Sequence, residues 1–446
     1  MESTNSTEWA NVPFSDSPYG YISNVNPLLY SPTNARFEEN GFALFLLQAV
    51  VILVFCNVFG YAFQRLLGQP RVVGDLLAGV VIGPTALGNV PLFTSTVFPS
   101  VQRPELNLVA QIGLVVFLFL VGLETDTDLM LAHWHSVLLI TVPPFALTFG
   151  VSVGIAHLFW QELTDGTQPF TTFFVFVGTV MAVTSLSVLS RILSEMGLLS
   201  TKMGAMSIAA GAGNDTLGYC LLAIASALAG GGQQIYALYQ LLAFTAWLLI
   251  LVFLWRPLLF RWLKAAGVNN MEANSHDHVP RLLIVAGVLG GLISSCVSDM
   301  VGLHTLVGAF FYGVAIPHGR YAVAITEAVE TPVTLLLLPL YFGTVGLKID
   351  FKTLNTGLVW GLIILLIFVI FLTKGSSTTI CARLSGLSWR QAMCVGALMQ
   401  SKGVIEVVIG AIALEAGVID VQVFSALFLV FLATTSLVRP LARIIY

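Results

Sequence analysis

Apolar segments recur along most of this 446-residue chain, and short polar loops separate them. A helix of about 20 apolar residues is long enough to cross the hydrocarbon core of a membrane. Only 9% of the residues are charged, whereas a typical soluble domain has about 25%, so water cannot cover these segments favourably. The sequence therefore predicts an all-α polytopic membrane protein.

Thirteen segments are candidates for transmembrane helices. They lie near residues 42–63, 72–88, 107–124, 136–160, 170–193, 203–229, 236–263, 281–300, 302–317, 331–349, 357–384, 390–416 and 421–441. The second and the ninth are short and rich in glycine, so their boundaries are poorly defined. The number of transmembrane segments is therefore determined to within one.

The residues before the first segment, 1–41, are polar and rich in serine, asparagine and proline. They lack a basic stretch ahead of an apolar run, so they predict a disordered tail and not a cleaved signal peptide. Residues 42–446 are expected to form one transmembrane domain.

Arginine and lysine indicate the orientation of the segments, because they concentrate in cytosolic loops. With the N-terminus outside, thirteen of them fall in inner loops and three in outer loops. The inner residues are Arg65, Arg71, Arg191, Lys202, Arg256, Arg261, Lys264, Arg281, Arg320, Arg383, Arg390, Arg439 and Arg443, and the outer residues are Arg36, Arg103 and Lys352. The N-terminus is therefore expected outside or in a lumen and the C-terminus in the cytosol. The sequence does not distinguish the plasma membrane from an endomembrane.

The loops are too short for a catalytic domain and carry no nucleotide-binding motif, so neither an enzyme nor an ATP-driven pump is expected. Five scattered cysteines have no paired spacing that would indicate disulfides or zinc. His276 and His278, in the longest loop, could bind a metal, but a solvated linker is the favoured interpretation. No cofactor, resident metal or nucleic-acid partner is expected. The lipid bilayer is expected to surround the protein.

The sixth segment carries Asn214 and Asp215 near its middle, among glycine and alanine. A charge at the centre of a lone helix costs roughly 2.5–3.5 kcal/mol on insertion scales, which favours an ion pathway over the alternative of a permanently hydrogen-bonded structural carboxylate. A carboxylate away from water can hold a proton or a monovalent cation, but not both well. This competition predicts exchange at Asp215, and Asn214 adds a neutral carbonyl oxygen.

Polar residues also interrupt the fifth and twelfth segments. In the fifth, Thr184, Ser185 and Ser187 could satisfy a locally unwound backbone or replace the water around a cation, or they could only pack between helices. In the twelfth, Lys402 and Glu406 are four residues apart, on one helix face, and predict a gate or a fold-holding ion pair, ahead of the alternative of direct ion binding. Interrupted helices in corresponding places of two inverted halves are typical of secondary transporters.

Three further charges lie inside or at the ends of segments. Lys348 is either an anchor that reaches the membrane surface or a lysine paired with Asp215. Glu124 is either a helix-end carboxylate or part of a vestibule that attracts cations. Lys374 is either a residue that reaches the inner surface or a contact within the helix bundle.

Six ordered motifs add a resemblance to these observations: QPRVVGDLLAGVVIGPTALG, FLFLVGLETD, VTSLSVLSRILSEMGLLST, GNDTLGY, LPLYFGTVGLKID and MQSKGVIEVV. Together they resemble the monovalent cation:proton antiporter-2 family, of the plant cation/H⁺ exchanger and fungal K⁺/H⁺ antiporter type, from about residue 42 to the C-terminus. The resemblance implies a sodium/proton-exchanger-like fold with inverted repeats, two crossed discontinuous helices and a homodimer. It implies that residues 42–446 exchange K⁺ or Na⁺ for H⁺ by alternating access.

The resemblance also implies roles for individual residues. Asn214 and Asp215 fall on the family's ion and proton site, and Thr184 falls on the family's broken helix, next to Ser185. Lys348 and Glu124 fall on its supporting charges. Lys402, Glu406 and Ser187 complete the expected supporting residues.

This sequence departs from the family pattern at several positions. The fifth segment lacks a proline after Thr184, so a softer break is expected, with Ser185 and Ser187 satisfying the backbone. Tyr219 stands where tryptophan is usual, and Lys402 stands where arginine is usual. Relatives often continue into a hydrophilic regulatory region, so a bare transport domain is expected.

A proton-coupled transporter of an organic solute and a K⁺-channel-like protein are the alternative functions.

Overall fold

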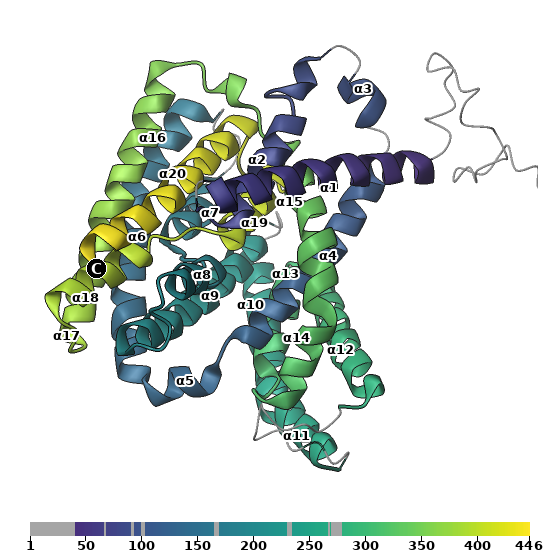
Figure 1. Cartoon of the computed structure of the whole chain (residues 1–446), viewed down its shortest axis with the longest axis vertical. Coiled ribbons are helices and arrows are strands. Elements are labelled where there is room, and N and C mark those ends of the chain that lie inside the picture. The colour runs from purple at the N-terminus through teal and green to yellow at the C-terminus, as the bar shows by residue number, and fades with distance from the viewer. Residues whose placement is uncertain are drawn as a thin grey trace, which may run out of the picture.

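The structure, a computed structural model, describes residues 41–66, 68–90, 93–99, 103–164, 169–229, 234–265, 268 and 279–446. Within these ranges the regular structure is helical throughout (Figure 1). The expected polar tail lies outside the described residues except for Gly41, where the first helix begins, and so do His276 and His278. The predicted boundary between tail and transmembrane domain stays a prediction.

The helices follow one another in two series. The first consists of α1 (Gly41–Leu66), α2 (Arg71–Ile82), η3 (Leu87–Asn89), α3 (Phe93–Val97), α4 (Arg103–Glu124), α5 (Thr127–Ala132), α6 (Trp134–Leu163), α7 (Phe170–Ala182), α8 (Leu186–Glu195), α9 (Lys202–Ala229), α10 (Gln234–Leu249), η5 (Ile250–Trp255) and α11 (Arg256–Ala265). The second consists of α12 (Arg281–Met300), α13 (Thr305–Ala315), α14 (Arg320–Pro332), η6 (Val333–Leu337), α15 (Leu338–Gly346), η7 (Phe351–Thr353), α16 (Gly357–Ile370), η8 (Phe371–Gly375), α17 (Ser376–Leu384), α18 (Trp389–Leu398), α19 (Val404–Glu415) and α20 (Val421–Ile445).

Eleven helical runs among the described residues are long and apolar enough to cross a membrane, so the predicted count of thirteen is not confirmed. The predicted segment at 302–317 is only the short apolar helix α13, and the one at 390–416 is divided into α18 and α19. The segment predicted at 331–349 belongs to a run that begins at Arg320, because α14 continues through η6 into α15. Glu327 and Glu330 in α14 interrupt the apolar pattern and concealed this earlier start.

The helices pack in two groups. The flanking group contains α1, α2, α4, α12, α13, α14 and α15, and the crossing group contains α6 to α9 and α16 to α20. Figure 1 shows α6, α16, α17 and α18 on one side of the molecule and α4, α12 and α14 on the other. The two groups meet where α9 contacts α13, and α20 also contacts η7, the short helix that follows α15. Two packed groups of helices are the arrangement that alternating access requires, because one group can move against the other.

Small residues bring the backbones of the flanking group close together. A Cβ atom placed on Gly346 of α15 would lie 2.3 Å from the Cα of Gly79 in α2, and one on Gly313 of α13 would lie 2.4 Å from the carbonyl oxygen of Phe119 in α4. Glycine at helix contacts allows the close packing on which association within lipid depends. The flanking group is therefore a tightly packed unit.

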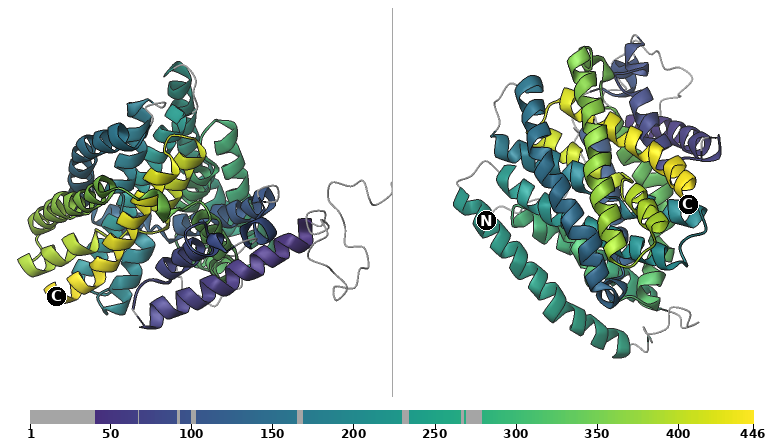
Figure 2. Two further views of the ribbon diagram at one scale, coloured as in Figure 1. Left: turned by 90° about the horizontal axis from the view of Figure 1, so that it is seen from above. Right: turned by 90° about the vertical axis from the view of Figure 1, so that its left-hand side faces the viewer.

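Two helical runs lie on the outside of the bundle, α1 and the run from α10 through η5 to α11 (Figure 2). Both expose large apolar side chains along their length, among them Val50 and Val54 in α1 and Phe253 and Leu254 in η5. Apolar surface of this extent is unfavourable in water and favourable in lipid. These runs are consistent with the expected bilayer surround.

Candidate functional site

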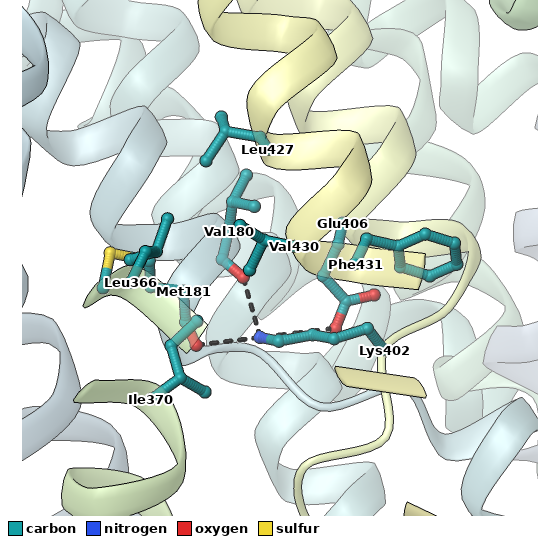
Figure 3. Close-up of a pocket in the computed structure, with 9 residues that line it drawn as sticks. All are labelled: Val180, Met181, Leu366, Ile370, Lys402, Glu406, Leu427, Val430 and Phe431. Carbon is teal, nitrogen blue, oxygen red and sulfur yellow. Dashed lines mark hydrogen bonds and ion pairs between the residues drawn. The ribbon is translucent and has the colours of Figure 1, made fainter. Parts of the chain in front are cut away.

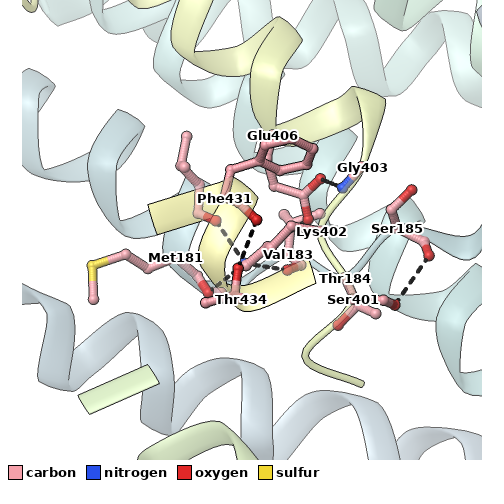
Figure 4. Close-up of polar contacts among 12 residues, drawn as sticks. Met181, Val183, Thr184, Ser185, Ser401, Lys402, Gly403, Glu406, Phe431 and Thr434 are labelled. Carbon is pink, nitrogen blue, oxygen red and sulfur yellow. Dashed lines mark hydrogen bonds and ion pairs between the residues drawn. The ribbon is translucent and has the colours of Figure 1, made fainter. Parts of the chain in front are cut away.

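The two interrupted helices cross at their interruptions, as Figure 4 shows. Extended backbone separates α7 from α8 at 183–185 and α18 from α19 around 401–403. The backbone N–H of Ser185 donates to the carbonyl oxygen of Ser401 at 3.0 Å, and the hydroxyl of Thr184 donates to the carbonyl oxygen of Met399 at 2.6 Å. The predicted pair of crossed discontinuous helices is therefore confirmed, and it forms without a proline in the first break.

The crossing has no room for a side chain at position 403. A Cβ atom on Gly403 would lie 2.1 Å from Oγ and 2.4 Å from Cβ of Ser185. The backbone of Gly403 is extended, with φ of −149°, so the requirement for glycine comes from space and not from an unusual conformation. Ser185 therefore lies directly against the second break.

Asn214 and Asp215 hold the beginning of α8. The backbone N–H of Thr184 donates to Oδ1 of Asn214 at 2.8 Å, and the backbone N–H of Leu186 donates to Oδ2 of Asp215 at 3.3 Å. Helix N-termini present N–H groups without intrahelical partners and favour a negative charge nearby. Both side chains are buried, and Oδ1 of Asp215 has no hydrogen-bond partner among the described residues. This oxygen is therefore available to a proton or a cation.

Two buried lysines hold the opposite end of the same break, the C-terminus of α7. Lys374 donates to the carbonyl oxygens of Ala182 and Val183, at 2.5 and 2.8 Å. Lys402 donates to the carbonyl oxygens of Val180, Met181 and Val183, at distances from 2.6 to 2.8 Å (Figure 4). The last carbonyls of a helix lack intrahelical partners and favour a positive charge. Both ends of the first break are thus stabilised by buried charges of the appropriate sign.

Lys402 and Glu406 form the ion pair that their spacing predicted, with 3.8 Å between Nζ and Oε1. Oε2 of Glu406 also accepts a hydrogen bond from the backbone N–H of Gly403 at 2.7 Å. The two side chains line a small pocket whose other walls are apolar, as Figure 3 shows. These walls are Val180, Met181, Leu366, Ile370, Leu427, Val430 and Phe431. The carbonyl oxygens of Val180 and Met181 in these walls already accept hydrogen bonds from Lys402, which favours a fold-holding pair over an ion-binding one.

Lys348 does not contact Asp215, so the predicted pair between them is wrong. It lies just after α15, in the flanking group, and its ammonium group forms an ion pair with Glu415 at the end of α19. Both side chains are partly exposed. The positive charge within electrostatic range of Asp215 is instead that of Lys374, which is fully buried. Of the two interpretations of Lys374, the contact within the bundle is the one observed.

No direct contact with Asp215 is observed for two other predicted supporting residues, Glu124 and Ser187. Glu124 is exposed at the end of α4, within electrostatic range of Glu330. The hydroxyl of Ser187 lies 3.0 Å from that of Ser185, on the first turn of α8. Ser187 therefore supports the break, and Glu124 remains a candidate for a vestibule.

Sequence reasoning missed Thr435, in α20. Its hydroxyl accepts from the backbone N–H of Lys402 at 3.2 Å and donates to the carbonyl oxygen of Lys402 at 2.9 Å, so one side chain satisfies both backbone groups of an unwound residue. The adjacent pair Thr434 and Thr435 inside an apolar segment was the signal that could have identified it.

Comparisons with known proteins agree with this arrangement. The sequence profile of the family described as sodium/hydrogen exchanger, transmembrane, matches residues 50–443. The K(+)/H(+) antiporter 1 of Saccharomyces cerevisiae is 34% identical over 435 residues, which cover 96% of this chain and 48% of that protein. The cation/H(+) antiporter 19 of Arabidopsis thaliana is 33% identical over 448 residues, which cover 100% and 54%. This chain thus spans about half the length of these two relatives.

Shorter relatives and a solved structure match almost end to end. The Na(+)/H(+) antiporter NhaS4 of Synechocystis is 26% identical over 412 residues, which cover 92% of this chain and 98% of that protein. The structure of the sodium proton antiporter MjNhaP1 from Methanocaldococcus jannaschii aligns with a TM-score of 0.62 at 16% identity, over 90% of this chain and 96% of that one. The latter likeness confirms the predicted fold. The chain belongs to the family of transmembrane sodium/hydrogen exchangers.

Proposed function

We propose that this chain is a secondary active antiporter that exchanges K⁺ or Na⁺ for H⁺ across a membrane by alternating access. The observation that carries the proposal is the unpartnered Oδ1 of Asp215, a buried carboxylate oxygen beside the crossing of two interrupted helices. The relatives named above as K⁺/H⁺ and Na⁺/H⁺ antiporters support the same assignment.

One carboxylate oxygen cannot be protonated and coordinate a cation at the same time. The N–H of Leu186 holds the other oxygen of Asp215, so the free oxygen keeps its orientation whether or not it carries a proton. Carboxylate, carbonyl and hydroxyl oxygens are the ligands that hard cations prefer. Asn214, Thr184 and Ser185 would supply the neutral oxygens of the ion and proton site next to Asp215.

Exchange at a single carboxylate implies one proton for each cation, and therefore no net movement of charge. A membrane potential contributes about 2.3 kcal/mol per elementary charge per 100 mV, so any net charge movement would make transport voltage-dependent. The proposed stoichiometry thus predicts rates that do not change with the membrane potential.

We further propose that the N-terminus lies outside or in a lumen, that the C-terminus lies in the cytosol, and that the protein is a homodimer. Arginine and lysine lie at the helix ends that flank the loop between α1 and α2 and the loop between α11 and α12, and near the end of α20, and this placement supports the orientation. Labelling single cysteines introduced at Lys352 and Lys264 with an impermeant reagent tests it, because only the first is expected to react from outside.

The experiment that tests the exchange reaction uses purified protein in proteoliposomes that contain a pH-reporting dye. Graded K⁺ or Na⁺ is added outside while the membrane potential is clamped. We expect proton efflux that saturates with cation concentration and vanishes without a cation. Proton movement that is indifferent to the cation would contradict the proposal, and cation flux that is indifferent to the pH gradient would indicate a channel.

A further inference from the structure

The side chain of Tyr219 carries one of three buried oxygens of α9 without a hydrogen-bond partner among the described residues, beside those of Asp215 and Ser226. The residue is fully buried, and its hydroxyl has no hydrogen-bond partner among the described residues. A buried hydroxyl without a partner is uncommon in native proteins, because it loses its bonds to water and gains none in return. The hydroxyl of Tyr219 therefore needs a partner that the described part of the chain does not supply.

Tyr219 follows Asp215 by four residues, so both side chains lie on the same face of α9. Helical side chains lean toward the N-terminal turn, and Tyr219 thus covers the turn that carries Asp215. Asp215 and Glu406 are the acidic groups within electrostatic range of the tyrosine hydroxyl. Two oxygens without partners, Oδ1 of Asp215 and the hydroxyl of Tyr219, therefore belong to one buried face of one helix.

The ring of Tyr219 is held in place from the other group of helices. Its centroid lies 4.1 Å from that of Phe310 in α13, and Phe310 is itself fully buried. Next to it, a Cβ atom on Gly218 would lie 2.7 Å from Val183, in the break between α7 and α8. The ring thus packs against the flanking group, and the residue before it packs against the first break.

We infer that the hydroxyl oxygen of Tyr219 is a ligand of the transported cation, together with Oδ1 of Asp215, and that it contributes to the choice between K⁺ and Na⁺. A tyrosine hydroxyl can accept as well as donate, so it can offer a lone pair to a cation. Because both residues are on α9, they move together when the crossing group moves, and the pair can accompany the cation from one side to the other. The inference rests on the proposed exchange at Asp215 and adds a neutral ligand to it.

The test compares equilibrium binding of K⁺ and Na⁺ to the purified wild-type protein and to Tyr219→Phe, measured by calorimetry at several pH values. This variant keeps the ring and its contact with Phe310 and removes only the oxygen. We expect the dissociation constant for the preferred cation to rise about tenfold, the change that corresponds to one contact with a charged group, and the preference between the two cations to shrink. Unchanged affinity and preference would overturn the inference.

Two further variants distinguish the contribution of the Tyr219 hydroxyl oxygen to cation affinity from that of its ring. Tyr321→Phe removes a buried hydroxyl of the flanking group that donates to the carbonyl oxygen of Leu283 at 2.8 Å, and it should leave cation binding unchanged. Phe310→Leu removes the ring contact and keeps the Tyr219 hydroxyl, so affinity should persist while the transport rate changes. An equal loss of affinity in Phe310→Leu would assign the effect to packing and overturn the inference. Wild-type binding that does not depend on pH would instead contradict the proposed exchange at Asp215, whatever Tyr219→Phe does.

Discussion

Lys374 and Lys402 donate hydrogen bonds to the same atom, the carbonyl oxygen of Val183, at 2.8 and 2.6 Å. Two buried ammonium groups so close together repel each other, and they need compensation from negative charge. The C-terminus of α7 supplies part of it, and the carboxylates of Asp215 and Glu406 lie within electrostatic range of Lys374.

This charge balance bears on transport. With Asp215 ionised, the two lysines and two carboxylates sum to zero. A proton or a monovalent cation adds the same single charge, so the charge of the buried cluster is equal in both loaded states. The surrounding structure can therefore bind either the proton or the monovalent cation without rearranging its other charges.

Lys402→Met should destabilise the protein strongly. The change leaves Glu406 buried without its partner and removes donors from the carbonyl oxygens of Val180 and Met181 in α7 and of Val183 just after it. Removing one member of a buried ion pair costs about 3–5 kcal/mol of unfolding free energy. A fall in the thermal midpoint of the detergent-solubilised protein measures the effect.

The matched control for this variant is Lys264→Met, which changes an exposed lysine of α11 and should leave the midpoint unchanged. Adding Glu406→Gln to Lys402→Met should recover part of the loss, because it removes the isolated charge. If the double variant is no more stable than Lys402→Met, the ion pair is not what holds the break.

Asp215→Asn should abolish exchange and preserve the fold. Asparagine has nearly the same volume, and its carbonyl oxygen can still accept the hydrogen bond from Leu186. It cannot take up a proton or balance the charge of a cation, so cation-dependent proton flux in proteoliposomes should fall to the level of empty vesicles, with the thermal midpoint nearly unchanged. Transport near the wild-type rate in this variant would refute the assignment of Asp215.

The sequence was informative about the crossing for a physical reason. Polar residues in an apolar segment raise the free energy of insertion unless they form hydrogen bonds or bind an ion. Thr184, Asn214 and Asp215 could therefore be identified before their partners were known. The break between α18 and α19 was recognisable from the polar run before Gly403 for the same reason. The free-energy cost of a polar residue can therefore be recognised from one segment of the sequence, without knowledge of the tertiary packing.

The partners of the charges were less predictable, because they depend on which helices meet. Lys348 and Lys374 are both lysines in or near apolar segments, and only the packing shows that one reaches Glu415 and the other reaches the end of α7. The carbonyl oxygens that attract Lys374 belong to residues whose side chains carry no polar signal, such as Ala182. Thr435 was missed likewise, because its partner is the backbone of another helix.

Gly403→Ala should disrupt the crossing, since its added methyl group would overlap the side chain of Ser185. Overpacking of this kind costs about 1–3 kcal/mol, so a lower thermal midpoint is expected. The double variant Ser185→Gly with Gly403→Ala removes the overlapping atoms and should regain stability relative to Gly403→Ala. Equal midpoints for the two variants would show that the crossing tolerates a larger separation.

Lys348→Gln should change stability little and leave cation binding intact. Its ion pair with Glu415 is partly exposed, and such pairs contribute about 0–1 kcal/mol. The expected result is a dissociation constant for K⁺ or Na⁺ close to that of the wild-type protein, measured by calorimetry. Glu415→Gln is the matched variant and should behave alike. A large loss of affinity in Lys348→Gln alone would restore Lys348 to the ion site.

Cation binding should weaken as the pH falls. Protons and cations compete for Oδ1 of Asp215, so the apparent dissociation constant for the cation should stay constant at high pH. It should then rise as the pH falls through the range where Asp215 takes up its proton, by about tenfold per pH unit once the proton dominates. Calorimetric titrations with K⁺ and Na⁺ across a series of pH values, in buffers free of both ions, measure this slope. Because each bound cation displaces one proton, the heat of binding in the acidic range should also vary with the ionisation enthalpy of the buffer. A flat dependence, with no buffer contribution to the heat, would mean that the cation and the proton do not share Asp215.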